Sequence, residues 1–78
     1  MNDLVWDRRM LGAFKAFSIL TEEEEIVLED WAKGKSIVNT SMMHNLSPRT
    51  VSRIRQRLRV KYDSIQPYTD LPKRGTRS

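Results

Sequence analysis

The sequence predicts an all-α fold, a compact bundle of about four helices. Apolar residues recur at the three- and four-residue spacing of one helix face in the first, second and fourth of the expected helices. Two helix starts carry complete capping signals, Thr21 with Glu24 and Ser47 with Pro48. A chain of 78 residues forms one small domain with a modest core. We therefore expect a helical domain over residues 1–65 and a basic, flexible tail over residues 66–78.

The composition excludes several classes of protein. The chain has no cysteine, which rules out disulfides and cysteine zinc sites and suits the reducing cytoplasm. Its N-terminus lacks the apolar run of a signal peptide, and no segment approaches a membrane span. We expect a cytoplasmic protein without membrane contact. Neither enzymatic activity nor a cofactor is expected, because no phosphate-binding loop, catalytic triad or pair of catalytic acids is present.

The first helix is expected over about residues 3–17. One broad face of this segment carries Trp6, Met10, Ala13, Phe14 and Phe17. We interpret this face as part of the core. The alternative is that part of it pairs with a second copy, giving a homodimer through the N-terminal helix. Leu4 and Leu11, which point away from the face, keep this alternative open.

The second helix is expected to begin after Thr21, which forms a capping box with Glu24. The acidic run Glu22–Glu25 suits the positive end of the helix dipole, and no further ligand accompanies it at metal-binding spacing. We therefore expect no metal site here. Gly34 suits the left-handed position after the helix, and the buried stripe is expected to be Val27, Leu28 and Trp31.

The third helix is expected to run from a Ser36 cap to about His44. Val38 and Met42 point outward and leave a small apolar patch. His44 is the only histidine, and we expect a half-buried hydrogen-bonding residue rather than a catalyst or a metal ligand. The inward positions of this helix are Ile37, Thr40, Ser41 and His44.

A tight turn follows the third helix. Asn45 suits the left-handed conformation that ends a helix, and Leu46 turns inward. Ser47 and Pro48 then start a fourth helix that is expected to reach about Ile65. Two helices set at a steep angle by such a turn are typical of a helix-turn-helix, here over about residues 36–62.

The fourth helix separates an apolar stripe from a basic face. The stripe, which must face the core, consists of Val51, Ile54, Leu58, Tyr62 and Ile65. In a helix-turn-helix the outer face of the N-terminal half enters the major groove, where arginine pairs with guanine and glutamine with adenine. The expected base-reading residues are therefore Arg49, Ser52, Arg53 and Gln56. The expected phosphate contacts are Lys35, Ser47, Thr50, Arg57, Arg59 and Lys61.

Two further residues of this helix need a separate interpretation. Arg55 lies near the buried edge, which suggests a structural role. Val60 lies on the outer face and suits either a thymine methyl group or a partner chain.

The charge distribution favours a polyanion as partner. The formal net charge of +4 divides into −4 over residues 1–34 and +8 over residues 35–78. Basic groups that are concentrated in one half of the chain can neutralise the phosphates of a nucleic acid, and this releases the counterions condensed on it. Double-stranded DNA is thus the expected partner. Lys73, Arg74 and Arg77 extend the basic charge into the tail, which either follows the DNA or has no function.

A set of residues within about 20–62 forms a pattern that is shared with known proteins. Its members are Leu20, Thr21, Glu24, Val27, Leu28, Ala32, Gly34, Ser36, Leu46, Ser47, Arg49, Thr50 and Val51. This pattern is similar to that of the DNA-binding domains of LuxR-type regulators and of the fourth region of bacterial primary sigma factors. Thr40 and His44 depart from the pattern, which prefers aliphatic or aromatic residues there. The whole chain further resembles small helix-turn-helix proteins of phages and prophages. These resemblances imply a four-helix unit with its last long helix in the major groove.

We therefore expect sequence-specific binding of double-stranded DNA by a transcriptional regulator. One alternative is a phage DNA-packaging adaptor, such as a small terminase subunit, which forms a ring of many copies. A second is an accessory protein that binds RNA polymerase through Val38, Met42 and the acidic first half of the chain.

Overall fold

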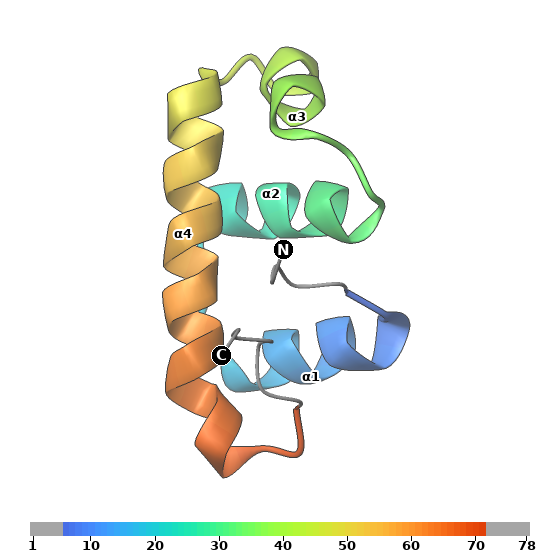
Figure 1. Cartoon of the computed structure of the whole chain (residues 1–78), viewed down its shortest axis with the longest axis vertical. Coiled ribbons are helices and arrows are strands. Elements are labelled where there is room, and N and C mark those ends of the chain that lie inside the picture. Colours follow the sequence, from blue (N-terminus) through green and yellow to red (C-terminus); the bar gives the residue numbers. More distant parts are fainter. Residues whose placement is uncertain (1–5, 72–78) are drawn as a thin grey trace, which may run out of the picture.

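The computed structural model describes residues 6–71 and is helical, without a strand in that range. The helices are α1 (Arg8–Phe17), α2 (Glu22–Ala32), α3 (Ile37–Met43) and α4 (Pro48–Ile65), and the 3-10 helix η1 (Gln66–Tyr68) follows α4 directly. Figure 1 shows α4 along one edge, with α1 and α2 lying across it on the same side and α3 beside its N-terminal end. The prediction of an all-α bundle of about four helices is confirmed.

The capping residues set the boundaries of α2, α3 and α4 where the sequence predicted them. The Thr21 hydroxyl accepts from the Glu24 N–H at 3.2 Å, and the Glu24 carboxylate accepts from the Thr21 N–H at 3.0 Å. The Ser36 and Ser47 hydroxyls accept from the Asn39 and Thr50 N–H groups and cap α3 and α4, and Pro48 is the first residue of α4. The two left-handed positions are Gly34, with φ of 85°, and Asn45, with φ of 57°.

Helix α1 ends at Phe17, as predicted, but differs from the prediction in its start and in the burial of Phe17. It begins at Arg8 rather than near residue 3, because the Asp7 carboxylate accepts from the Met10 N–H at 2.8 Å and caps the helix. Residues 1–5 lie outside the described range. Phe17 was expected in the core but is 63% exposed, since α1 ends at this residue and no described element covers it.

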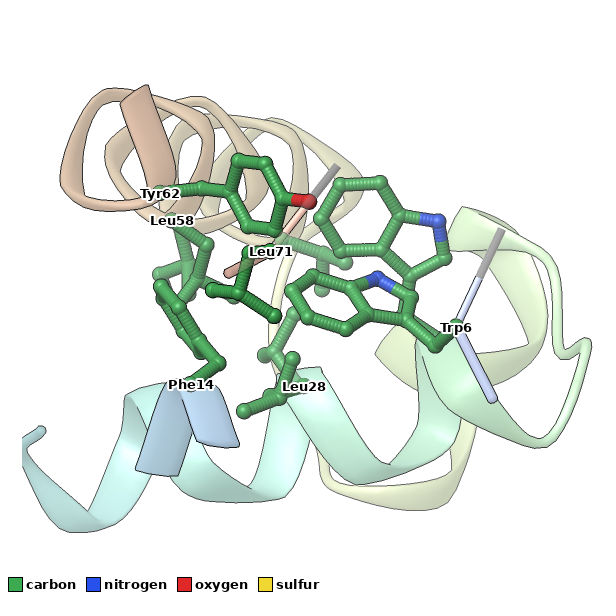
Figure 2. Close-up of a cluster of buried hydrophobic side chains, with 10 residues drawn as sticks. Trp6, Phe14, Leu28, Leu58, Tyr62 and Leu71 are labelled. Carbon is green, nitrogen blue, oxygen red and sulfur yellow. The ribbon is translucent and has the colours of Figure 1, made fainter. Parts of the chain in front are cut away.

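An aromatic cluster forms the centre of the core (Figure 2). Trp6 lies just before α1, with its ring centroid 5.2 Å from Phe14, 5.8 Å from Trp31 and 5.7 Å from Tyr62. Edge and tilted contacts at these distances are favourable for aromatic rings. The predicted core role of Trp6, Phe14 and Trp31 is confirmed. These rings pack against one another within a single chain.

The packed domain continues past its predicted end at residue 65. Proline at 67 ends α4, but η1 turns the chain back so that Leu71 is only 4% exposed within the core. The Gln66 side-chain amide donates to the Leu71 carbonyl at 3.0 Å, and Asp70 pairs with Arg9 at 2.6 Å. A tail beginning at residue 66 is therefore wrong for residues 66–71. Lys73, Arg74 and Arg77 lie outside the described residues.

Candidate nucleic-acid interface

The apolar stripe of α4 determines which of its side chains reach solvent. Val51, Ile54, Leu58 and Tyr62 are fully buried, as predicted, and Ile65 packs against them. Because α1, α2 and α3 all lie on one side of α4 (Figure 1), the opposite side faces outward. The side of α4 opposite to the other helices, which we call its outer face, is thus open to solvent along the helix.

The four expected base-reading residues all lie on this outer face. Arg49, Ser52, Arg53 and Gln56 are exposed. Arg49 and Arg53 are four residues apart, which places their side chains on the same side of successive helical turns. Neither guanidinium group makes a hydrogen bond or an ion pair with the residues that the structure describes. The N-terminal half of α4 therefore offers two unengaged guanidinium groups in one strip.

Arg57 and Arg59 flank this strip, and both have contacts within the chain. Arg57 is half-exposed, with its Nε 3.7 Å from the Glu24 carboxylate. The Arg59 guanidinium lies 5.1 Å from the centroid of the Trp31 ring and donates to the Gln56 side-chain oxygen at 3.3 Å. These contacts hold the two arginines at the edges of the outer face.

Both lysines that were expected to contact phosphate have partners within the chain, and Lys61 is directed into the fold. Lys61 Nζ donates to the Glu24 carboxylate at 2.6 Å and to the Ile19 carbonyl at 2.8 Å. Lys35 Nζ lies 3.0 Å from the Met43 sulfur. The helical period placed Lys61 beside the apolar stripe, and the carboxylate of Glu24 draws its ammonium group inward. We therefore leave Lys61 out of the proposed phosphate contacts.

Ser47 and Thr50, the remaining expected phosphate contacts, lie at the start of α4. The Ser47 hydroxyl accepts from the Thr50 N–H at 3.1 Å, and the two hydroxyl oxygens are 2.8 Å apart. Pro48 has no N–H and the Thr50 N–H is used by the cap, so it is the positive end of the helix dipole that favours an anion at this position.

Arg55 fixes the position of α4, in agreement with its predicted structural role. It is buried and donates to the Lys35 carbonyl at 2.7 Å. Its guanidinium also lies 4.8 Å from the centroid of the Trp31 ring, a cation–π distance. Arg55 thus links α4 both to the segment before α3 and to the end of α2.

Glu24 is buried, which the sequence analysis missed. Its side chain is 2% exposed, although the three neighbouring glutamates are exposed. Burial opposes ionisation, but hydrogen bonds from Lys61 and the Thr21 N–H and the charges of Lys61 and Arg57 outweigh it, so the pKa of Glu24 is lowered. A signal was present, since Glu24 has the helical spacing of the buried stripe with Val27, Leu28 and Trp31.

His44 is half-buried and hydrogen-bonded, as predicted. Its Nε2 lies 2.9 Å from the carboxylate of Asp30, a buried residue that the sequence analysis did not single out. The Asp30 carbonyl also accepts from the N–H groups of Lys33 and Lys35. The pair joins the end of α2 to the turn before α4. On α3, Val38 and Met42 are exposed, as predicted, and Met43 is exposed as well.

No helix within residues 6–71 has the length and apolar character needed to cross a membrane. The same range contains no group of three or more histidine, cysteine, aspartate or glutamate side chains that could hold a metal ion. No protein-family model, curated protein or solved structure matches the chain.

Proposed function

We propose that α3, the turn at Asn45 and α4 form a helix-turn-helix, and that the protein binds double-stranded DNA sequence-specifically as a cytoplasmic transcriptional regulator. The observation that carries this proposal is the strip on α4. Arg49 and Arg53 are exposed, one helical turn apart, and free of partners among the described residues. Such guanidinium groups are suited to bidentate hydrogen bonds with guanine in the major groove.

The basic residues of α4 have two different roles, which further supports the proposal. Arg55 and Lys61 hold the helix against α2 and the segment before α3. A recognition helix that is fixed in this way binds without a further cost for ordering its backbone. Arg57 and Arg59, at the edges of the outer face, are placed for phosphate contacts beside the groove. Ser52 and Gln56 complete the proposed base-reading set.

Selection from a pool of random duplexes at two salt concentrations tests the proposal. We expect a recovered sequence motif that survives the higher salt, because base contacts depend less on counterion release than phosphate contacts do. Retention without a motif, lost at the higher salt, would contradict sequence-specific binding.

Arg53→Ala tests the base-reading role on the selected site. It should weaken binding there by about 1–3 kcal/mol and weaken binding to random DNA less. Arg9→Ala is the matched control, since Arg9 is an exposed arginine on α1 that pairs with Asp70. It should leave both affinities unchanged. Equal losses for Arg53→Ala on both DNAs would contradict base reading by this residue.

One observation favours a second candidate function, an accessory protein that binds RNA polymerase. Val38, Met42 and Met43 expose apolar side chains on α3, and Met42 is 77% exposed. Exposed methionines adapt well to protein partners. A pull-down of polymerase in the absence of DNA, with Met42→Asp as the disrupted variant, tests this candidate. Capture of polymerase that Met42→Asp does not reduce would contradict docking through α3.

A further inference from the structure

A pocket lies between α1 and the C-terminal end of α2. Its volume of about 390 Å³ is within the range of small-molecule sites. We call it the α1–α2 pocket, and the two helices contribute Arg8, Leu11, Lys15, Glu29, Ala32 and the cap residue Lys33 to it. Because α1 and α2 lie on the same side of α4 (Figure 1), this pocket is separate from the outer face of α4.

The apolar part of the lining is held in place by the core. Trp6 borders the pocket and is only 8% exposed, while Leu11 and Ala32 are half-buried. The centroid of the Trp6 ring is 5.8 Å from that of Trp31 and 5.7 Å from that of Tyr62. An aromatic side chain that is packed in this way offers an apolar surface whose position is set before a ligand binds.

The charged part of the lining contains two cations that the fold leaves unengaged. Lys15 Nζ donates to the Glu29 carboxylate at 2.7 Å, and this hydrogen bond lowers the pKa of Glu29. The Asp7 carboxylate caps the start of α1, where the helix dipole is positive. Arg8 and Lys33, by contrast, are exposed and make no hydrogen bond or ion pair with the residues that the structure describes.

The two parts of the lining together suit a small anion with an apolar body. The lining has three basic and two acidic side chains, so its net charge is +1 and one negative charge neutralises it. Guanidinium and ammonium groups both bind carboxylates, and an aromatic ring packs favourably beside an indole. A DNA backbone matches the pocket poorly, because its phosphates would meet the Asp7 and Glu29 carboxylates and an apolar surface.

We propose that the α1–α2 pocket binds a small aromatic carboxylate. The carboxylate lies at Arg8 and Lys33, and the ring lies against Trp6 and Leu11. This site goes beyond the proposed DNA binding and does not rest on it, because none of its residues belongs to α4.

Titration of the full chain with 2-naphthoate, followed by NMR on ¹⁵N-labelled protein, tests the site. The chain has two tryptophans, so the indole N–H signal of Trp6 can be followed individually. We expect 2-naphthoate to shift this signal and the backbone signals of Leu11 and Ala32, with a Kd of about 1 mM or below. 2-Naphthamide, which has the same ring without the charge, should bind at least about tenfold more weakly.

The combined change Arg8→Gln and Lys33→Gln tests the two cations. It should raise the Kd of 2-naphthoate at least about tenfold and leave that of 2-naphthamide unchanged. The helical circular dichroism should not change, because both side chains are exposed and neither has a hydrogen bond among the described residues. Arg9→Gln is the matched control, since Arg9 neighbours Arg8 on α1 but pairs with Asp70. It should leave both Kd values unchanged.

Three results would overturn the proposal. They are an unshifted Trp6 signal at about 10 mM 2-naphthoate, well above the expected Kd, equal affinities for the acid and the amide, and an unchanged Kd in the doubly substituted chain. The titration contains no DNA, so none of these results bears on the proposed function. A chain that binds 2-naphthoate through Arg8 and Lys33 but binds no duplex would contradict the proposed function alone.

Discussion

Lys61→Met tests whether the ion pair between α2 and α4 stabilises the fold. The substitution keeps most of the side-chain stem and removes the ammonium group that lies 2.6 Å from the buried Glu24 carboxylate. Leaving one charge of a buried pair without its partner costs about 3–5 kcal/mol. Lys61 is itself one-third exposed, and Glu24 keeps the Thr21 N–H at 3.0 Å and Arg57 at 3.7 Å. We therefore reduce the expected loss to about 2 kcal/mol.

Thermal unfolding followed by circular dichroism at pH 7 measures this loss. In a domain of this size about 2 kcal/mol lowers Tm by roughly 10 °C. Lys15→Met is the matched control, because the Lys15–Glu29 pair has a similar length of 2.7 Å but is more exposed at the carboxylate. It should cost at most about 0.5 kcal/mol. The reasoning is refuted if Lys61→Met is no more destabilising than Lys15→Met, or if Glu24→Gln costs as much in the Lys61→Met background as alone.

Two further predictions concern buried polar groups. The pKa of Glu24 is lowered from its ordinary value of 4.5, so its carboxylate stabilises the fold above pH 4.5 and this contribution is lost as the pH falls through the lower folded-state pKa. Glu24→Gln should therefore flatten the loss of stability between pH 4.5 and more acidic conditions, as measured by urea unfolding at several pH values; an unchanged pH dependence would contradict this. Thr40 is fully buried, and its hydroxyl has no hydrogen-bond partner within the described part of the chain. Thr40→Val should raise the free energy of unfolding by about 1 kcal/mol in the same assay, because it removes an unsatisfied polar group at nearly constant volume. A destabilised Thr40→Val variant would show that the hydroxyl has a partner.

Local signals were sufficient to predict α2, α3 and α4. Thr21, Ser36 and Ser47 cap their helices through backbone hydrogen bonds, which depend on residues only three positions away. The left-handed conformation of Asn45 is likewise a local property. The start of α1 near residue 3 was wrong, although Asp7, which caps the helix, is a local signal of the same kind.

Contacts between distant segments could not be predicted in the same way. Leu71 reaches the core after a turn whose direction depends on how η1 packs against α4. The pairing of Glu24 with Lys61 joins residues 37 positions apart, and the pairing of Asp30 with His44 joins residues 14 positions apart. Helical spacing places each of these residues on a face, but the angle between helices decides which faces meet. The exposure of Phe17 follows from the same tertiary arrangement.

The basic residues of α4 show most clearly what tertiary structure adds to a count of charges. Arg55 and Lys61 donate to buried groups and hold the helix in place. Arg49 and Arg53 have no partner among the described residues and face outward. The first pair therefore contributes to folding, while only the outward groups are available to neutralise phosphates or to pair with bases. Since the salt dependence of binding scales with the number of phosphates neutralised, its slope on DNA should reflect the outward subset of α4 rather than its total charge.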